Sequence, residues 1–142
     1  MTRRLLPLCW LLLGACGEVA PCVSCPQVAG DYTVLWGDSE VDEGCTIDGP
    51  RVAELTLAQT DSNVTTAVNA VPMGGTLYVT YDLLLRSGNA ERSYALRAVV
   101  IPGAQLIDGG TDIELRGSFT TQELDEAGNQ CEARDSFTAT RR

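Results

Sequence analysis

The amino-acid sequence predicts an all-β domain over residues 30–142, an antiparallel up-and-down meander of seven or eight strands that closes into a small barrel. Apolar and polar residues alternate with a period of two through most of this region, which is the pattern of a half-buried antiparallel sheet. Short segments rich in glycine, asparagine, aspartate and proline separate the alternating stretches, and no helical pattern longer than about one turn competes. Closure into a barrel removes exposed strand edges, and a two-sheet sandwich is the alternative.

Each expected strand has one apolar face. The first strand begins at Gly30 and carries Tyr32, Val34 and Trp36 on that face. Segment 76–86 shows the clearest alternation and is expected to form one unbroken strand. The other strands are expected at 53–59, 64–70, 92–101, 112–121 and 131–140, with an eighth if 104–107 pairs.

Two turns predict strand registers. A two-residue turn at Asp61-Ser62 pairs Leu57 with Thr66 and, further along, Leu55 with Val68. A four-residue loop over 87–90 sets the pairing of the next predicted hairpin. The resulting apolar pairs are Leu83 with Tyr94, Tyr81 with Leu96, Val79 with Ala98 and Leu77 with Val100.

Residues 1–15 are expected to form a cleaved signal peptide. Arg3 and Arg4 provide a basic start. The uncharged run that follows is too short to span a membrane as a helix, which takes about 20 apolar residues. The sequence Leu13-Gly14-Ala15-Cys16 at its end resembles the lipobox of bacterial lipoproteins. The resemblance implies that the chain is cut before Cys16 and that the thiol of Cys16 carries a lipid; the alternative is an ordinary secretory signal that leaves Cys16 as a plain thiol.

The resemblance also implies a location. A lipidated Cys16 would anchor the chain in a membrane of the bacterial cell envelope, so that the membrane is a partner through the lipid. Gly17 follows the cysteine where many Gram-negative lipoproteins that stay at the inner membrane have aspartate, which favours the outer membrane.

The charge of the chain excludes one class of partner. Its formal net charge is −9 at pH 7, and loss of Arg3 and Arg4 with the signal peptide makes the remainder more acidic. Nucleic-acid binding requires basic side chains that neutralise phosphates, so no nucleic-acid partner is expected. For the same reason the lipid on Cys16, and not the protein surface, is expected to hold the domain at an anionic membrane.

Residues 16–29 are interpreted as a lipidated N-terminus followed by a tether, because they contain two prolines and no periodicity. Once Cys16 carries a lipid, four cysteines remain for disulfide pairing in the mature chain, and they allow three pairings. We expect Cys45 to pair with Cys131, because the first and last strands of a closed meander are neighbours. We expect Cys22 to pair with Cys25 as a structural disulfide, since a redox motif would require a βαβ setting; a zinc site would require two close pairs.

The tripeptide Gly30-Asp31-Tyr32 at the start of the first strand is similar to the opening of lipocalin-like barrels, whose first strand carries Gly-x-Trp. Tyrosine replaces the tryptophan here. The resemblance implies a cup for a small apolar ligand. It also implies that Arg134 or Arg141 takes the place of the late arginine that packs on this aromatic residue.

Inward-facing side chains are the candidate ligand-lining residues. They would either fill the core of a small barrel or line a pocket for a small apolar ligand. Asp135 shares the inward face of Phe137, and a buried carboxylate there is expected to meet an arginine or lie near a strand end; otherwise it would be a polar anchor inside a ligand cup. The candidates are Tyr32, Trp36, Tyr81, Tyr94, Phe119, Phe137 and Asp135.

No catalytic residue, cofactor or metal site is expected. The chain has no histidine and no lysine, so it lacks a general base suited to neutral pH and the parts of a Ser-His-Asp or Ser-Lys set. The acidic run 38–44 resembles the start of an EF-hand loop. However, Glu43 stands where the loop needs glycine and Gly49 where it needs a bidentate glutamate, so we expect a solvated loop.

Two functions remain. One is a non-enzymatic envelope domain that contacts another protein or acts as a structural part. The other is a lipocalin-like carrier of a small apolar ligand. A cavity of roughly several hundred Å³ inside the barrel would favour the carrier, and a packed core would favour the interaction domain.

Overall fold

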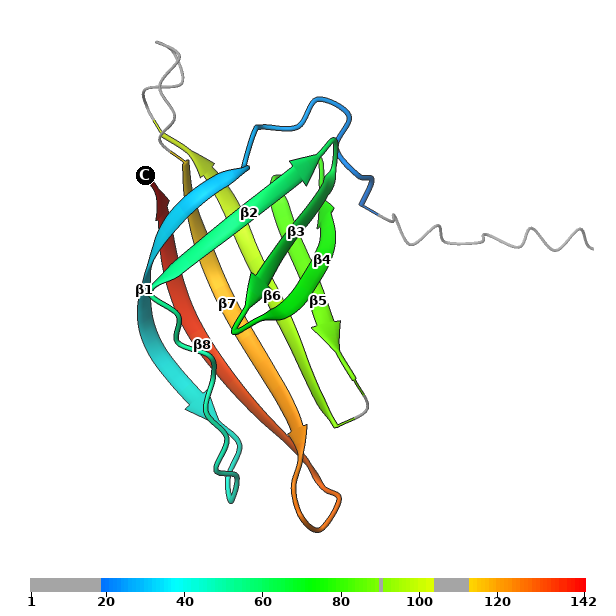
Figure 1. Ribbon diagram of the computed structural model, residues 1–142, viewed down its shortest axis with the longest axis vertical. Helices are drawn as coiled ribbons and strands as arrows, with labels where there is room; N and C mark the ends of the chain where they lie inside the picture. The colour runs from blue at the N-terminus through cyan, green and yellow to red at the C-terminus, as the bar shows by residue number, and fades with distance from the viewer. Residues whose placement is uncertain (1–18, 90, 104–112) are drawn as a thin grey trace, which may run out of the picture.

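A computed structural model describes residues 19–89, 91–103 and 113–142 of the chain. Eight antiparallel strands follow one another around a closed barrel, and β8 returns to pair with β1 (Figure 1). The predicted closed meander is therefore confirmed, and the sandwich alternative is not formed. The strands are β1 (Gly30–Val41), β2 (Glu54–Thr60), β3 (Asn63–Val68), β4 (Val71–Leu77), β5 (Asp82–Gly88), β6 (Arg92–Pro102), β7 (Ile113–Leu124) and β8 (Gln130–Arg141).

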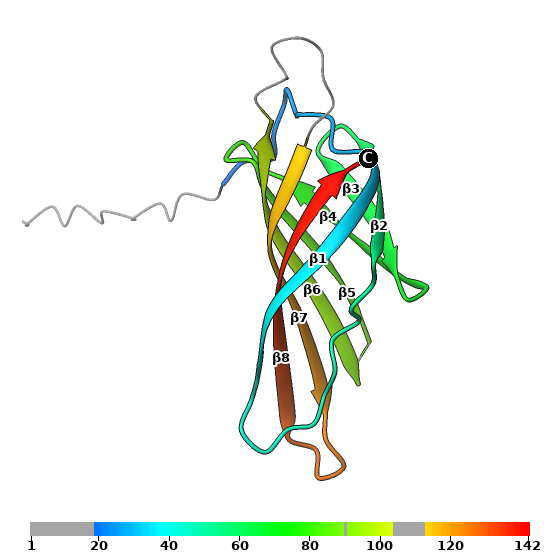
Figure 2. The same ribbon diagram turned by 90° about the vertical axis from the view of Figure 1, so that its left-hand side faces the viewer.

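The barrel wall is taller on one side than on the other. Strands β1, β6, β7 and β8 contain 11 or 12 residues, whereas β2 to β5 contain 6 or 7. At about 3.3 Å per residue, the long strands reach well beyond the short ones. Figure 2 shows β7, β8 and the segment after β1 extending past the short strands at one end.

The segment expected to be one strand over 76–86 is in fact two strands joined by a tight turn over residues 78–81. The amide of Tyr81 donates to the carbonyl of Tyr78, and Tyr81 has a φ of 65°. A turn of four residues preserves the period-two alternation, which explains why the sequence pattern runs through it without a break. This split supplies the eighth strand; the alternative eighth strand at 104–107 lies outside the described residues.

One predicted register is confirmed and one is wrong. At the Asp61-Ser62 turn Ala58 pairs with Thr65, which is the predicted β2–β3 register. In the β5–β6 hairpin Leu83 pairs with Ala98 instead of Tyr94, a slip of four residues. Asn89 explains the difference, because its Oδ1 accepts hydrogen bonds from the amides of Glu91 and Arg92 and so places the turn after Gly88. An even slip leaves the same side chains facing inward.

Both predicted disulfides are present, Cys45 with Cys131 and Cys22 with Cys25. The first of them ties the segment between β1 and β2, residues 42–53, to the start of β8. We call this segment the loop cap, because it crosses the barrel end that the short strands leave open. The indole of Trp36 donates to the carbonyl of Val52 at 2.8 Å, and Arg92 donates to the carbonyl of Asp48 at 3.1 Å.

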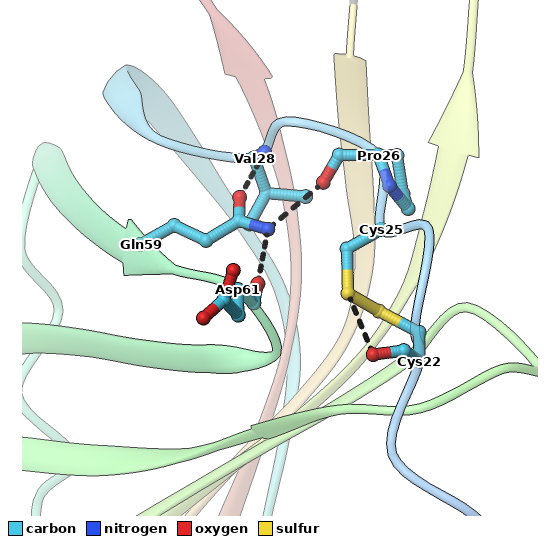
Figure 3. The surroundings of a disulfide bond; sticks show 6 residues. All are labelled: Cys22, Cys25, Pro26, Val28, Gln59 and Asp61. Carbon is cyan, nitrogen blue, oxygen red and sulfur yellow. Dashed lines mark hydrogen bonds between the residues drawn. A yellow bond between two sulfur atoms is a disulfide. The ribbon is translucent and has the colours of Figure 1, made fainter.

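The segment interpreted as a tether does not lie free of the barrel. Residues 21–29 lack regular strands, as their prolines predict, but they cover the opposite end, and we call them the N-terminal cap. Val28 is fully buried; its amide donates to Oε1 of Gln59 at 2.7 Å, and Nε2 of Gln59 donates to the carbonyl of Pro26 (Figure 3). Cys22 belongs to the core, and its amide donates to the carbonyl of Leu77.

Tyr32 joins the N-terminal cap to the first strand. Its side chain is fully buried, and its hydroxyl donates to the carbonyl of Val28 at 2.7 Å. Arg141, on β8, lies directly opposite Tyr32 of β1 and donates to the carbonyls of Gln27 and Ala29. Its guanidinium group also neighbours the hydroxyl of Tyr32, so of the two arginines expected to meet this aromatic residue, Arg141 is the one that does.

Alkaline titration is expected to reveal this buried tyrosine. Burial raises the pKa of Tyr32 to about 12, although the neighbouring Arg141 guanidinium opposes the shift. The unfolded chain releases this proton near pH 10, so the contribution of Tyr32 to stability is complete below about pH 10 and is lost as the pH rises toward 12. Subtracting the ultraviolet titration curve of Tyr32→Phe from that of wild type should leave a transition near pH 12. A difference curve centred near pH 10 would show that the pKa of Tyr32 is not raised.

Candidate functional site

The interior of the barrel is filled by its own side chains. The ring of Trp36 packs on Phe119 and Phe137 with centroids 6.2 and 5.8 Å apart, and Tyr94 packs on Phe119 at 5.6 Å. The hollow that remains between Trp36, Val52 and Phe119 measures about 10 Å³. That is roughly the space of one water molecule, and far below the volume of a small-molecule site.

Most of the candidate ligand-lining residues face inward as predicted, but they pack against one another. Tyr32, Phe119 and Phe137 are buried, and Trp36 and Tyr94 pack against the core with part of their surface exposed. The prediction for Tyr81 is wrong: it is 43% exposed, because it belongs to the turn between β4 and β5 and to the alternation of neither strand.

Asp135 faces inward on β8, and its side chain is only 1% exposed. Its Oδ1 accepts a hydrogen bond at 3.0 Å from Nη2 of Arg51, which belongs to the loop cap and is 49% exposed. Gly49 lies against the other oxygen, so closely that a Cβ at this position would come within 1.9 Å of it. The predicted arginine partner is thus present, and the ion pair closes the barrel end under the loop cap.

Breaking this ion pair from its two sides is expected to have unequal effects. Arg51→Gln leaves a buried carboxylate without its charged partner and should lower the free energy of unfolding by about 2–3 kcal/mol. Asp135→Asn leaves the half-exposed Arg51 to water and should cost about 1 kcal/mol. Urea unfolding of both variants at neutral pH measures the difference; a larger loss for Asp135→Asn would show that the carboxylate is not the costly partner.

Two adjoining grooves lie on the outside of the barrel. The first, of about 1020 Å³, runs between residues 19–21 and the outer faces of β4 to β7. Its exposed apolar residues include Val19 and Val99. The second, of about 880 Å³, lies further along β5 to β8. The two grooves meet at Arg97 and Ser118, which line both.

We call the second groove the arginine groove, because outward arginines surround it. The pairing of neighbouring strands places Arg86, Ala95, Thr120 and Arg134 in one row across β5 to β8. Arg97 lies one row away, opposite Ser118. Among the described residues Arg134 pairs with Glu132 at 3.0 Å, whereas Arg86 and Arg97 are exposed and form no ion pair.

Arg51 and the arginine groove are not among the site residues that the sequence predicts. A signal for the groove is present, since half of the ten basic residues fall between 86 and 134 in a chain with a net charge of −9. Each alternates with an inward apolar residue or lies near a strand end, a pattern that is also typical of an ordinary solvated strand face. No comparable signal marks Arg51, because its partner Asp135 is 84 residues away.

The described part of the chain contains no group of three or more histidine, cysteine, aspartate or glutamate side chains that could hold a metal ion. The same residues contain no helix with the length and apolar character needed to cross a membrane. Comparison with known proteins gives no match to any protein family, curated protein or solved structure.

Proposed function

We propose that this chain is a lipid-anchored protein of the bacterial cell envelope, and that its barrel is a non-enzymatic binding module that recognises its partner on its outer surface. One contrast carries the proposal. The interior hollow measures about 10 Å³, whereas the two outer grooves measure about 1020 and 880 Å³. In the part of the chain that the structure describes, a ligand of ordinary size therefore has room in either outer groove, whereas this interior hollow is too small for it.

The caps support this proposal. Residues 42–53 and 21–29 each cover one end of the barrel, and hydrogen bonds join each of them to barrel residues. The Cys45–Cys131 disulfide ties residues 42–53 to β8, and the Cys22–Cys25 disulfide lies within residues 21–29. A carrier needs an open mouth, but both ends here carry buried side chains, Val28 at one and Pro50 at the other. The closed strand ladder makes the outer face a rigid platform, which lowers the ordering cost of binding.

The proposed anchor rests on the resemblance of Leu13-Gly14-Ala15-Cys16 to the lipobox, with its basic start and its apolar run. Cys16 precedes Val19, the first described residue, by three positions, which span at most about 11 Å. A lipid on Cys16 would thus hold the end with the N-terminal cap toward the membrane. The groove at Val19 would then open beside the lipid surface, and the arginine groove would lie farther from it.

Photocrosslinking in the native envelope tests the proposed binding face. Ser118 is shared by the two grooves on β7, and Ala67 is an exposed residue on β3, on the opposite side of the eight-strand ring. Benzoylphenylalanine placed at position 118 should form an adduct with an envelope component when illuminated. The same group at position 67 should give little or none.

The outcome decides the proposal in either direction. An adduct at 118 that is absent at 67 supports binding on this face. Equal adducts from both positions, or none from 118, would contradict it.

A further inference from the structure

The arginine groove has a chemistry that restricts the class of its partner. We infer that it binds a polyanionic saccharide, a sugar chain that carries sulfate, phosphate or carboxylate groups. This inference rests on the proposed function for the place of binding and adds the class of ligand.

The spacing of the arginines fits a ligand with several anionic groups. Arg86 and Arg134 stand in one row on β5 and β8, three strand spacings or about 14 Å apart, and Arg97 lies between them one row away. Ala95 and Thr120 lie between these two arginines in the row, and Ser118 lies opposite Arg97, so the arginines are separated by residues with short side chains. A linear chain lying across the strands would meet the three arginines in turn.

Charge favours an anion at this place. Within the described ranges Arg86 and Arg97 form no ion pair, although the chain carries an excess of acidic residues. A groove focuses the field of the charges that line it, and the planar guanidinium group pairs with sulfate, phosphate or carboxylate through two parallel hydrogen bonds. These two arginines are thus free to bind an external anion.

The other lining residues favour a saccharide over a protein. Six of them carry aliphatic hydroxyl or amide groups, which hydrogen-bond to sugar hydroxyls, and the acidic lining residue Glu132 is paired with Arg134. The centre of a protein interface is instead built on large aromatic and apolar side chains, and none of the exposed large apolar residues of the described chain lines this groove. The lining residues with an aliphatic hydroxyl or amide group are Ser87, Asn89, Ser93, Ser118, Thr120 and Gln122.

A nucleic acid fits this groove less well than a saccharide. Binding of single strands depends on aromatic side chains on which bases stack. Tyr94 is the aromatic residue among those that line the groove, and its ring packs on Phe119 in the barrel and under the guanidinium of Arg92. These two contacts occupy its ring, which is therefore not free to stack on a base.

Titration of the full chain after signal removal, in detergent, with a size-defined heparin hexasaccharide tests the inference. We expect saturable binding that weakens as salt is raised. Arg86→Ser and Arg97→Ser should each raise the Kd roughly tenfold, because each removes one charged contact. The matched control is Arg142→Ser. Arg142 is an exposed arginine that lies outside the groove and pairs with Glu54, so its removal should leave the Kd unchanged.

Polyglutamate and single-stranded DNA of similar charge serve as competing probes. The inference is overturned if the hexasaccharide does not bind, if either competitor binds as tightly, or if Arg142→Ser weakens binding as much as Arg97→Ser. Arg97→Gln, with circular dichroism as the check on folding, replaces any serine variant that unfolds. Failure here leaves the crosslinking at Ser118 as a separate test of the binding face, so that the two proposals fail independently.

Discussion

Replacing Cys45 and Cys131 together by serine is expected to lower the free energy of unfolding by roughly 4–5 kcal/mol. The disulfide closes a loop with a sequence separation of 86, so its removal restores much conformational freedom to the unfolded chain. Removing the disulfide also releases the loop cap from β8. The contact of Arg51 in the loop cap with Asp135 in β8 depends on this attachment. Urea unfolding under non-reducing conditions measures the loss.

The matched control is the double serine variant of Cys22 and Cys25, whose separation is only 3. Closing so short a loop stabilises by no more than about 2 kcal/mol in the same chain-entropy treatment. Equal losses for the two double variants would contradict the account of the loop cap. Free thiols in the denatured wild type, detected with a maleimide, would show that the pairing is incomplete.

The second large effect concerns attachment to the membrane. Cys16→Ser is expected to abolish incorporation of an alkyne fatty acid and to move the protein from the membrane fraction to the soluble fraction. Serine has no thiol to carry the lipid. Each lipid CH₂ buried in a bilayer contributes about 0.8 kcal/mol to membrane binding, and the serine variant loses this contribution entirely. Cys22→Ser should still be labelled, since Cys22 belongs to the barrel core. Labelling that survives in Cys16→Ser would contradict the proposed anchor.

Much of the fold could be predicted from the sequence, because alternation and closure are local and topological properties. The inward faces of β1, β6 and β8 follow from period-two patterns, and the pairing of Cys45 with Cys131 follows from the meeting of the first and last strands. The break at 78–81 could not be predicted in this way, since a four-residue turn preserves the alternation. The slip of the β5–β6 hairpin has the same cause: an even slip moves no side chain to the other face, so the pattern cannot detect it.

The candidate site was harder to predict, because its residues meet only in the folded chain. Arg86 and Arg134 are 48 positions apart in the sequence but share one row across four strands. Likewise, the prolines of 21–29 correctly indicated an absence of regular strands, but they gave no sign that Val28 would be fully buried beside Gln59. Whether an interior is packed or hollow depends on how side chains interlock, which alternation does not specify.

Native mass spectrometry of the protein extracted from its own envelope tests most directly whether binding occurs outside or inside the barrel. Two variants serve as matched probes, Arg97→Ser in the outer groove and Phe119→Leu in the packed interior. We expect a partner retained by wild type to be retained also by Phe119→Leu and to be lost from Arg97→Ser. A small apolar ligand retained by wild type and by Arg97→Ser, but lost from Phe119→Leu, would contradict it and identify the barrel as a carrier.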